Sequence, residues 1–113
     1  MKTIPSLILA ALLTLLPACA TYKQTAGKLL ASTALTVDAA MRSWATVVKM
    51  GKATDDQQAK VRSAYEQYQL AMQAAEAAYV VLTGTGERGA WMIASSELNT
   101  KSTTLTSLVL SFK

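Results

Sequence analysis

The sequence predicts an all-α protein, an antiparallel three-helix bundle that follows an N-terminal signal peptide. Apolar residues recur at the alternating three- and four-residue spacing of a heptad within residues 26–50 and 54–82, and again within 90–112. Glycine-containing breaks separate these segments, and a short apolar run opens the chain. A second arrangement fits the same pattern, a long helical hairpin over residues 26–82 with a loosely docked C-terminal helix.

The chain opens with a leader typical of exported proteins. Lys2 gives it a positive start, and residues 4–16 form a mostly apolar run. That run is shorter than the ~20 residues that a membrane-spanning helix needs, and it fits a secretory signal peptide. We therefore expect residues 1–18 to be a signal peptide, residues 19–27 a polar tether, and residues 28–113 the helical bundle domain.

The end of the leader, Leu16-Pro17-Ala18-Cys19, resembles the lipobox of bacterial lipoproteins. Leu16 supplies the bulky apolar residue at −3, Ala18 the small residue at −1, and Cys19, the only cysteine, the acceptor at +1. Pro17 departs from the small residue usual at −2. The resemblance implies cleavage before Cys19 and a covalent lipid on its thiol, with no other cofactor. Anchoring by several acyl chains is stable, so the lipid bilayer is the first expected partner.

A second cleavage site overlaps the first. Ala18-Cys19-Ala20 has the A-x-A form that an ordinary signal peptidase uses, and cleavage after Ala20 would leave a soluble periplasmic protein. If Cys19 is lipidated, Ala20 stands where many inner-membrane lipoproteins carry an aspartate. The lipoprotein resemblance therefore implies the bacterial cell envelope, at the outer membrane facing the periplasm.

The first helix is expected over residues 26–50. Asp38 and Arg42 are four residues apart in the favourable acid-first order. Gly51, with Lys49 before it and Lys52 after it, is typical of a helix stop. The predicted buried seam of this helix consists of Leu30, Ala34, Val37, Met41, Trp44 and Val48.

The second helix is expected from the capping box Thr54-Asp55-Asp56-Gln57 to about Leu82. Its two acids lie at the positive end of the helix dipole. Many alanines favour helix here and allow neighbouring backbones to approach closely. The predicted seam consists of Val61, Tyr65, Tyr68, Met72, Ala75, Tyr79 and Leu82.

Three glycines within residues 83–89 predict an exposed loop, since no strand precedes it and no P-loop lysine follows. The third helix is expected over residues 90–112, although its serines and threonines are mediocre helix formers. Residues 104–112 also fit a strand, which would lack a partner strand. The predicted seam consists of Trp91, Ala94, Leu98, Leu105, Leu108 and Phe112, with Lys101 at the one polar position.

The residue inventory excludes several functions. With no histidine and one cysteine, the chain has no histidine general base, no Cys/His zinc site and no internal disulfide. Its net charge of +4 is scattered, unlike the clustered basic patch of a nucleic-acid-binding protein. Helix capping accounts for Asp55 and Asp56 without a metal ion. We therefore expect no enzyme, no catalytic residue, no metal site and no nucleic-acid partner.

Three residues are candidate partner contacts. Tyr65 and Tyr68 place two phenol hydroxyls on one helical turn, and both need polar partners. Arg88 lies in the glycine loop, so we expect its replacement by alanine to leave stability unchanged. The expected partners besides the bilayer are an envelope protein, a cell-wall polymer or a second copy, because heptad seams also pair between chains.

The most economical function is therefore an accessory or interaction module of the envelope, anchored through Cys19. The small size and the Ala-, Thr- and Gln-rich helices also resemble the small lipoproteins that phages and prophages carry for lysis or superinfection exclusion. A soluble secreted periplasmic protein cut after Ala20 is the third alternative.

Overall fold

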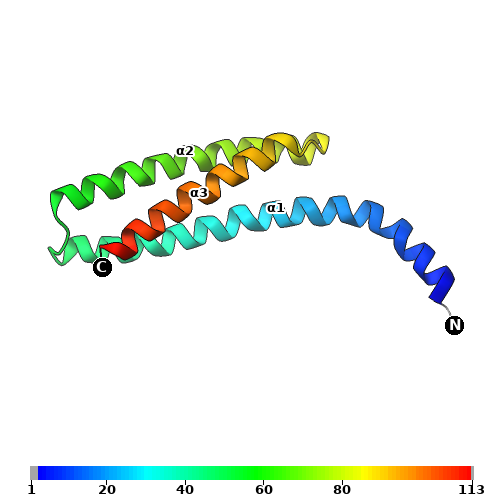
Figure 1. Ribbon diagram of the computed structural model, residues 1–113, viewed down its shortest axis with the longest axis horizontal. Coiled ribbons are helices and arrows are strands. Elements are labelled where there is room, and N and C mark those ends of the chain that lie inside the picture. Colours follow the sequence, from blue (N-terminus) through cyan, green and yellow to red (C-terminus); the bar gives the residue numbers. More distant parts are fainter. Residues whose placement is uncertain (1–2, 113) are drawn as a thin grey trace.

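The computed structural model describes the backbone of residues 3–112 and the side chains of residues 21–112. Three helices follow one another: α1 (Thr3–Lys49), α2 (Asp55–Thr85) and α3 (Gly89–Ser111). Residues 3–112 contain no strand. Successive helices run antiparallel and pack side by side, so the C-terminus returns to the α1–α2 turn (Figure 1). The predicted all-α helical bundle is confirmed.

The turn between α1 and α2 is built as the sequence predicts. Gly51 has a φ of 69°, a left-handed conformation that glycine adopts at no steric cost. The Gly51 N–H donates to the Val48 carbonyl at 3.0 Å, and the Lys52 N–H donates to the Val47 carbonyl at 3.1 Å. These two bonds are the pair that defines a Schellman C-cap, and they satisfy carbonyls that the helix end would leave open.

The start of α2 carries the predicted capping box. The Gln57 N–H donates to Thr54 Oγ1 at 3.1 Å, and the Thr54 N–H donates to Gln57 Oε1 at 3.0 Å. Asp55 and Asp56 lie in the first turn, as the helix dipole favours. The other end of α2 continues to Thr85, three residues beyond the predicted end, and Gly86 then takes a left-handed φ of 78°.

The expected tether is wrong for the residues whose side chains are described. Residues 21–27 are helical, since α1 is continuous up to Lys49. Ala26 is only 3% exposed, and Tyr22 packs against the same core. The bundle therefore begins before residue 28, because this turn of helix has apolar surface to bury. The remaining tether residues and the predicted signal peptide lie outside the described side chains.

In α2, the core keeps the predicted line of every seventh residue but differs at the alternate positions of the seam. Val61, Tyr68, Ala75 and Leu82 are buried as expected. The alternate seam members are only partly buried, whereas the alanines that precede two of them are in the core. The partly buried set is Tyr65, Met72 and Tyr79, and the buried alanines are Ala71 and Ala78. Alanines in the centre of the seam let a neighbouring helix approach closely, and the larger side chains flank it.

The seams of the outer helices need smaller corrections. In α1, Ala34 is exposed, so its assignment to the core is wrong, while Val37 and Trp44 are buried. In α3, the core also takes Val109, which the prediction omitted. The predicted α3 seam members are otherwise buried or partly buried against the core.

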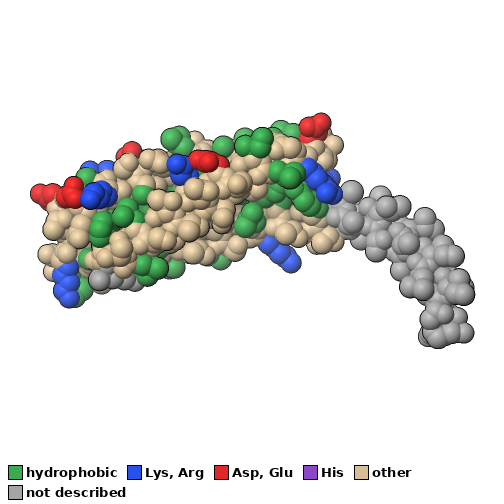
Figure 2. Space-filling model, viewed as in Figure 1, with side chains coloured by type: hydrophobic (Ala, Val, Ile, Leu, Met, Phe, Trp, Pro, Cys, Tyr) green, Lys and Arg blue, Asp and Glu red, His purple; other side chains and the backbone are tan. Residues whose placement is uncertain are grey.

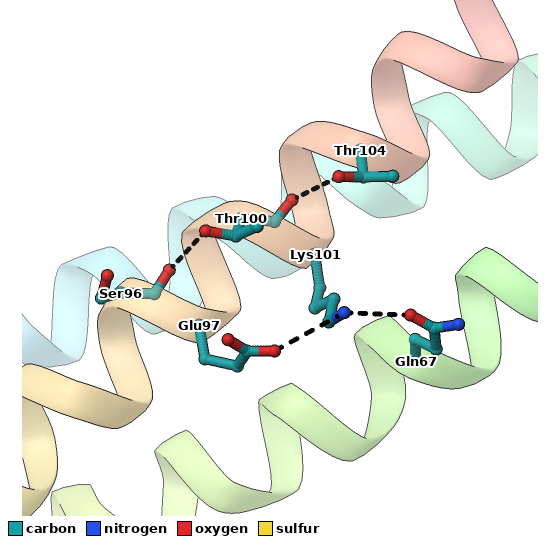
Figure 3. A network of polar contacts seen from close by, with 6 residues as sticks. All are labelled: Gln67, Ser96, Glu97, Thr100, Lys101 and Thr104. Atoms are coloured by element: carbon teal, nitrogen blue, oxygen red, sulfur yellow. Dashed lines mark hydrogen bonds and ion pairs between the residues drawn. The ribbon is translucent and has the colours of Figure 1, made fainter.

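Helix α3 continues to Ser111, so the strand alternative for residues 104–112 is wrong. Its hydroxyls find acceptors within their own helix: Thr104 donates to the Thr100 carbonyl at 2.8 Å, and Thr100 to the Ser96 carbonyl at 3.1 Å (Figure 3). Such bonds satisfy serine and threonine without breaking the helix ladder. A Ser- and Thr-rich segment can therefore remain helical when its other face is packed.

Lys101 occupies the polar seam position of α3 and reaches across to α2. Its Nζ donates to Gln67 Oε1 at 3.0 Å and lies 3.6 Å from Glu97 Oε1 (Figure 3). Its aliphatic stem covers the seam while the ammonium group reaches polar partners, the usual arrangement for a partly buried lysine.

The closest pair of helices is α2 and α3, and α1 packs on both less extensively. The alternative of an α1–α2 hairpin with a loosely docked third helix is therefore wrong.

Two aromatic contacts hold the ends of the bundle together. The rings of Trp44 and Phe112 are 5.9 Å apart at one end, and those of Tyr79 and Trp91 are 6.0 Å apart at the other.

Candidate functional site: a groove between α1 and α2

A groove follows the line where α1 faces the first half of α2. It consists of two adjoining hollows of about 310 and about 210 Å³ that share Met41 and Tyr65. We call these two hollows together the α1–α2 groove. The first is also lined by Ala34, Leu35, Val37, Asp38 and Tyr68, and the second by Trp44, Gln58, Val61 and Arg62.

The two predicted contact tyrosines form the α2 wall of this groove. Tyr65 and Tyr68 stack in a tilted arrangement with ring centroids 5.9 Å apart. Tyr68 is buried and Tyr65 is partly buried, so Tyr65 presents more of its ring to a partner. Burial raises the pKa of the Tyr68 phenol above 10.0, and the nearby Tyr65, Glu76 and Asp38 raise it further.

The rim of the groove on α1 carries an apolar side chain beside an ion pair. Leu35 is 71% exposed, which leaves most of its surface in water. Asp38 is held by Arg42 at 2.9 Å in the predicted pair, and both side chains are exposed. The groove therefore combines apolar and aromatic walls with charge at the edge, a surface that suits the apolar side chains of a protein partner.

The groove arises where the α1 seam departs from its predicted path. Ala34 was placed in the core, yet it is exposed and lines the first hollow. An alanine there is too short to fill the space towards Tyr68. The sequence signal was a small residue facing aromatic residues of the next helix, but that facing depends on how α1 and α2 are rotated.

Arg88 lies away from this groove, beside Tyr22 of α1. Its guanidinium carbon is 4.0 Å above the centroid of the Tyr22 ring, a cation–π contact. Lys23 Nζ donates to the Thr83 carbonyl at 3.4 Å and adds a second link between α1 and the end of α2. The predicted loop is exposed at residues 86–88, and the contact of Arg88 with Tyr22 links it to α1.

A separate hollow, between α1 and α3, was not predicted. It is lined by small uncharged polar residues, and Thr36 donates to the Ser32 carbonyl at 2.8 Å inside it. Its hydroxyls largely bond to their own helices, so they offer a partner little that is uncommitted. The lining consists of Ser32, Thr33, Thr36, Asn99, Ser102, Thr103 and Thr106.

The predicted lipidation and cleavage residues Leu16, Ala18 and Cys19 lie outside the described side chains. In residues 21–112, no three acidic, histidine or cysteine side chains gather as metal ligands would. None of the helices, as far as the described residues extend, is long and apolar enough to cross a membrane.

No protein-family model, curated protein or solved structure matches the chain.

Proposed function

We propose that the protein is a small non-enzymatic lipoprotein of the bacterial envelope, anchored through Cys19, whose bundle serves as an interaction module in the periplasm. The observation that carries this proposal is the position of Cys19. The only cysteine follows the apolar leader at the lipobox distance, and α1 packs against the core from Tyr22, a few residues after it. A lipid at Cys19 would therefore hold the bundle directly against the bilayer.

The α1–α2 groove supports the interaction part of the proposal. It is the surface where Tyr65 and Leu35 lie together with a charged rim, and it runs along the side of the bundle. A protein anchored at Cys19 would present that side to proteins or polymers of the periplasm. The candidate contacts remain Tyr65 and Tyr68.

Fractionation of Gram-negative cells that express the full chain tests the anchoring. The native protein should sediment with the outer membrane and resist a high-salt wash, while Cys19→Ser should appear in the periplasm or retain its leader. A native chain released in full by osmotic shock would contradict the proposal.

Pro17→Ala is the matched control, because it restores the small residue usual at −2. If Pro17 only slows cleavage, Pro17→Ala should increase the processed fraction without moving the protein to another compartment. If the native chain is periplasmic and Pro17→Ala is membrane-bound, the soluble alternative cut after Ala20 is correct for the native sequence.

A further inference from the structure

One end of the bundle carries four exposed apolar side chains. Val80 and Val81 lie in the last two turns of α2, and Met92 and Ile93 lie in the first two turns of α3. The four side chains are 42–76% exposed. We call these four residues the turn-end patch. Leu29 of α1 is a further exposed apolar side chain.

Two basic side chains lie at the same end as the turn-end patch. Lys23 of α1 donates to the Thr83 carbonyl, and Arg88 of the α2–α3 turn lies over the Tyr22 ring, with the carboxylate of Glu87 in the same turn. Figure 2 shows apolar side chains gathered at this end of the described surface with basic side chains beside them. Arg88 is fixed there by Tyr22 at 4.0 Å, so the charge is held close to the bundle.

The turn-end patch lies at the end of the bundle where Tyr22 and Lys23 of α1 meet α2 and the α2–α3 turn. The contacts of Tyr22 with Arg88 and of Lys23 with Thr83 place the α2–α3 turn beside residues 22–23. Cys19 is three residues before Tyr22, about 5 Å along a helix axis. An anchor at Cys19 would therefore hold this end, and not the α1–α2 turn, at the lipid surface.

We propose that the turn-end patch and its cations rest on the anionic surface of the bilayer that holds the anchor. This inference rests on the proposed function, since the anchor brings the patch to the membrane. Apolar side chains beside lysine and arginine are what an interfacial membrane contact requires. A second copy of the chain fits less well, because pairing two such ends would bring like charges together.

The test uses the mature protein with one added cysteine, labelled with an environment-sensitive fluorophore and reconstituted in vesicles of phosphatidylcholine and phosphatidylglycerol. Ile93→Cys reports on the patch. Met50→Cys is the matched control, because Met50 is also exposed and apolar but lies in the α1–α2 turn at the opposite end. Reconstitution should reduce quenching by aqueous iodide several-fold at position 93 and leave position 50 unchanged.

Equal quenching at both positions, in protein whose intact mass shows acylation, would overturn the membrane contact while leaving the anchor in place. If the mass shows no acylation, the proposed function fails, and unlabelled chain is then sedimented with the same vesicles in low salt. Binding that high salt or Ile93→Asp abolishes would still support the patch. Absence of binding would overturn it as well.

Discussion

Gly27 shows how a single absent side chain sets the distance between two helices. A Cβ built at this position would lie 2.9 Å from Tyr79 Oη and 3.4 Å from its ring carbon Cζ. Tyr79 is in turn held edge-on against Trp91. Glycine inside a helix costs stability, and here it allows the phenol of α2 to lie against the α1 backbone.

Gly27→Ala should therefore gain little or lose stability, although alanine favours helix by about 1 kcal/mol over glycine. In a Tyr79→Phe background the closest atom is gone, and the same substitution should recover most of that gain. Gly84→Ala is the matched control, since Gly84 is helical and has open space around it. Thermal unfolding of the native chain, Gly27→Ala, Tyr79→Phe and the double variant measures the coupling free energy between positions 27 and 79. A coupling of zero would contradict the close approach of Tyr79 to the α1 backbone.

Tyr68 makes the stability of the bundle depend on alkaline pH. Its folded-state pKa is raised above 10.0 by burial, so the unfolded chain ionises first as the pH rises. The contribution of neutral Tyr68 is complete below pH 10 and decreases as the pH rises through 10 towards the folded-state pKa.

Tyr68→Phe should accordingly lose less stability than the native chain between about pH 8 and about pH 11. Chemical unfolding at several pH values measures the free energy of unfolding of both proteins. Taking the difference between them cancels the titration of the lysines, which both proteins share. If both proteins lose the same free energy, the phenol of Tyr68 is not the group responsible.

At the scale of the helices, the sequence predicted which face of each helix is buried more reliably than it predicted which residues lie in the middle of that face. The heptad spacing correctly predicted Val61, Tyr68, Ala75 and Leu82, because every seventh residue of a packed helix returns to the same face. The choice between the residues on either side of that line was less secure. Ala71 and Ala78, rather than Met72 and Tyr79, lie in the middle of the buried face, where α3 packs closely against α2. How closely two helices pack depends on both of them, so the sequence of α2 alone does not predict it.

Helix ends were predictable where side chains make the cap. The Thr54 capping box and Gly51 were both correct, since these motifs need only neighbouring residues. Thr54→Ala should destabilise the bundle by about 1 kcal/mol, the usual cost of an N-cap replacement. Thr54→Ser keeps the hydroxyl and should retain most of the stability. Equal melting temperatures for Thr54→Ala and the native chain would mean that the cap contributes nothing.

The α2–α3 turn gives a second prediction for the elements. Because Arg88 stacks on Tyr22, Arg88→Ala should lower stability by about 0.5–1 kcal/mol, contrary to the sequence-based expectation of no change. Arg88→Lys should lose part of that amount, while Glu87→Ala serves as an exposed control in the same turn. Tyr22→Leu should remove the effect of Arg88→Ala in a double-mutant cycle, and unchanged additivity would contradict the contact.

At the scale of the whole molecule, the candidate groove was only half predictable. Tyr65 and Tyr68 were identified because two phenols on one turn demand explanation. Leu35 and Asp38 were not assigned to the same site, since their meeting depends on the rotation of α1 against α2. The docking of Arg88 on Tyr22 joins residues far apart in sequence, which local pattern cannot show.

The same arrangement gives the molecule two different ends. Tyr22 and Lys23 of α1 contact the α2–α3 turn and the end of α2 at one end of the bundle. The α1–α2 turn and the C-terminus lie at the other end (Figure 1). Under the proposed anchoring, the first end faces the bilayer and the second faces the periplasm.

The central claim, anchoring through Cys19, is tested most directly by the intact mass of the protein purified from bacterial membranes, compared with Cys19→Ser. The account predicts a chain that begins at Cys19 and carries the mass of its acyl chains, both absent from the variant. An unmodified chain that begins at Thr21 would contradict it, and would make the protein a soluble periplasmic bundle.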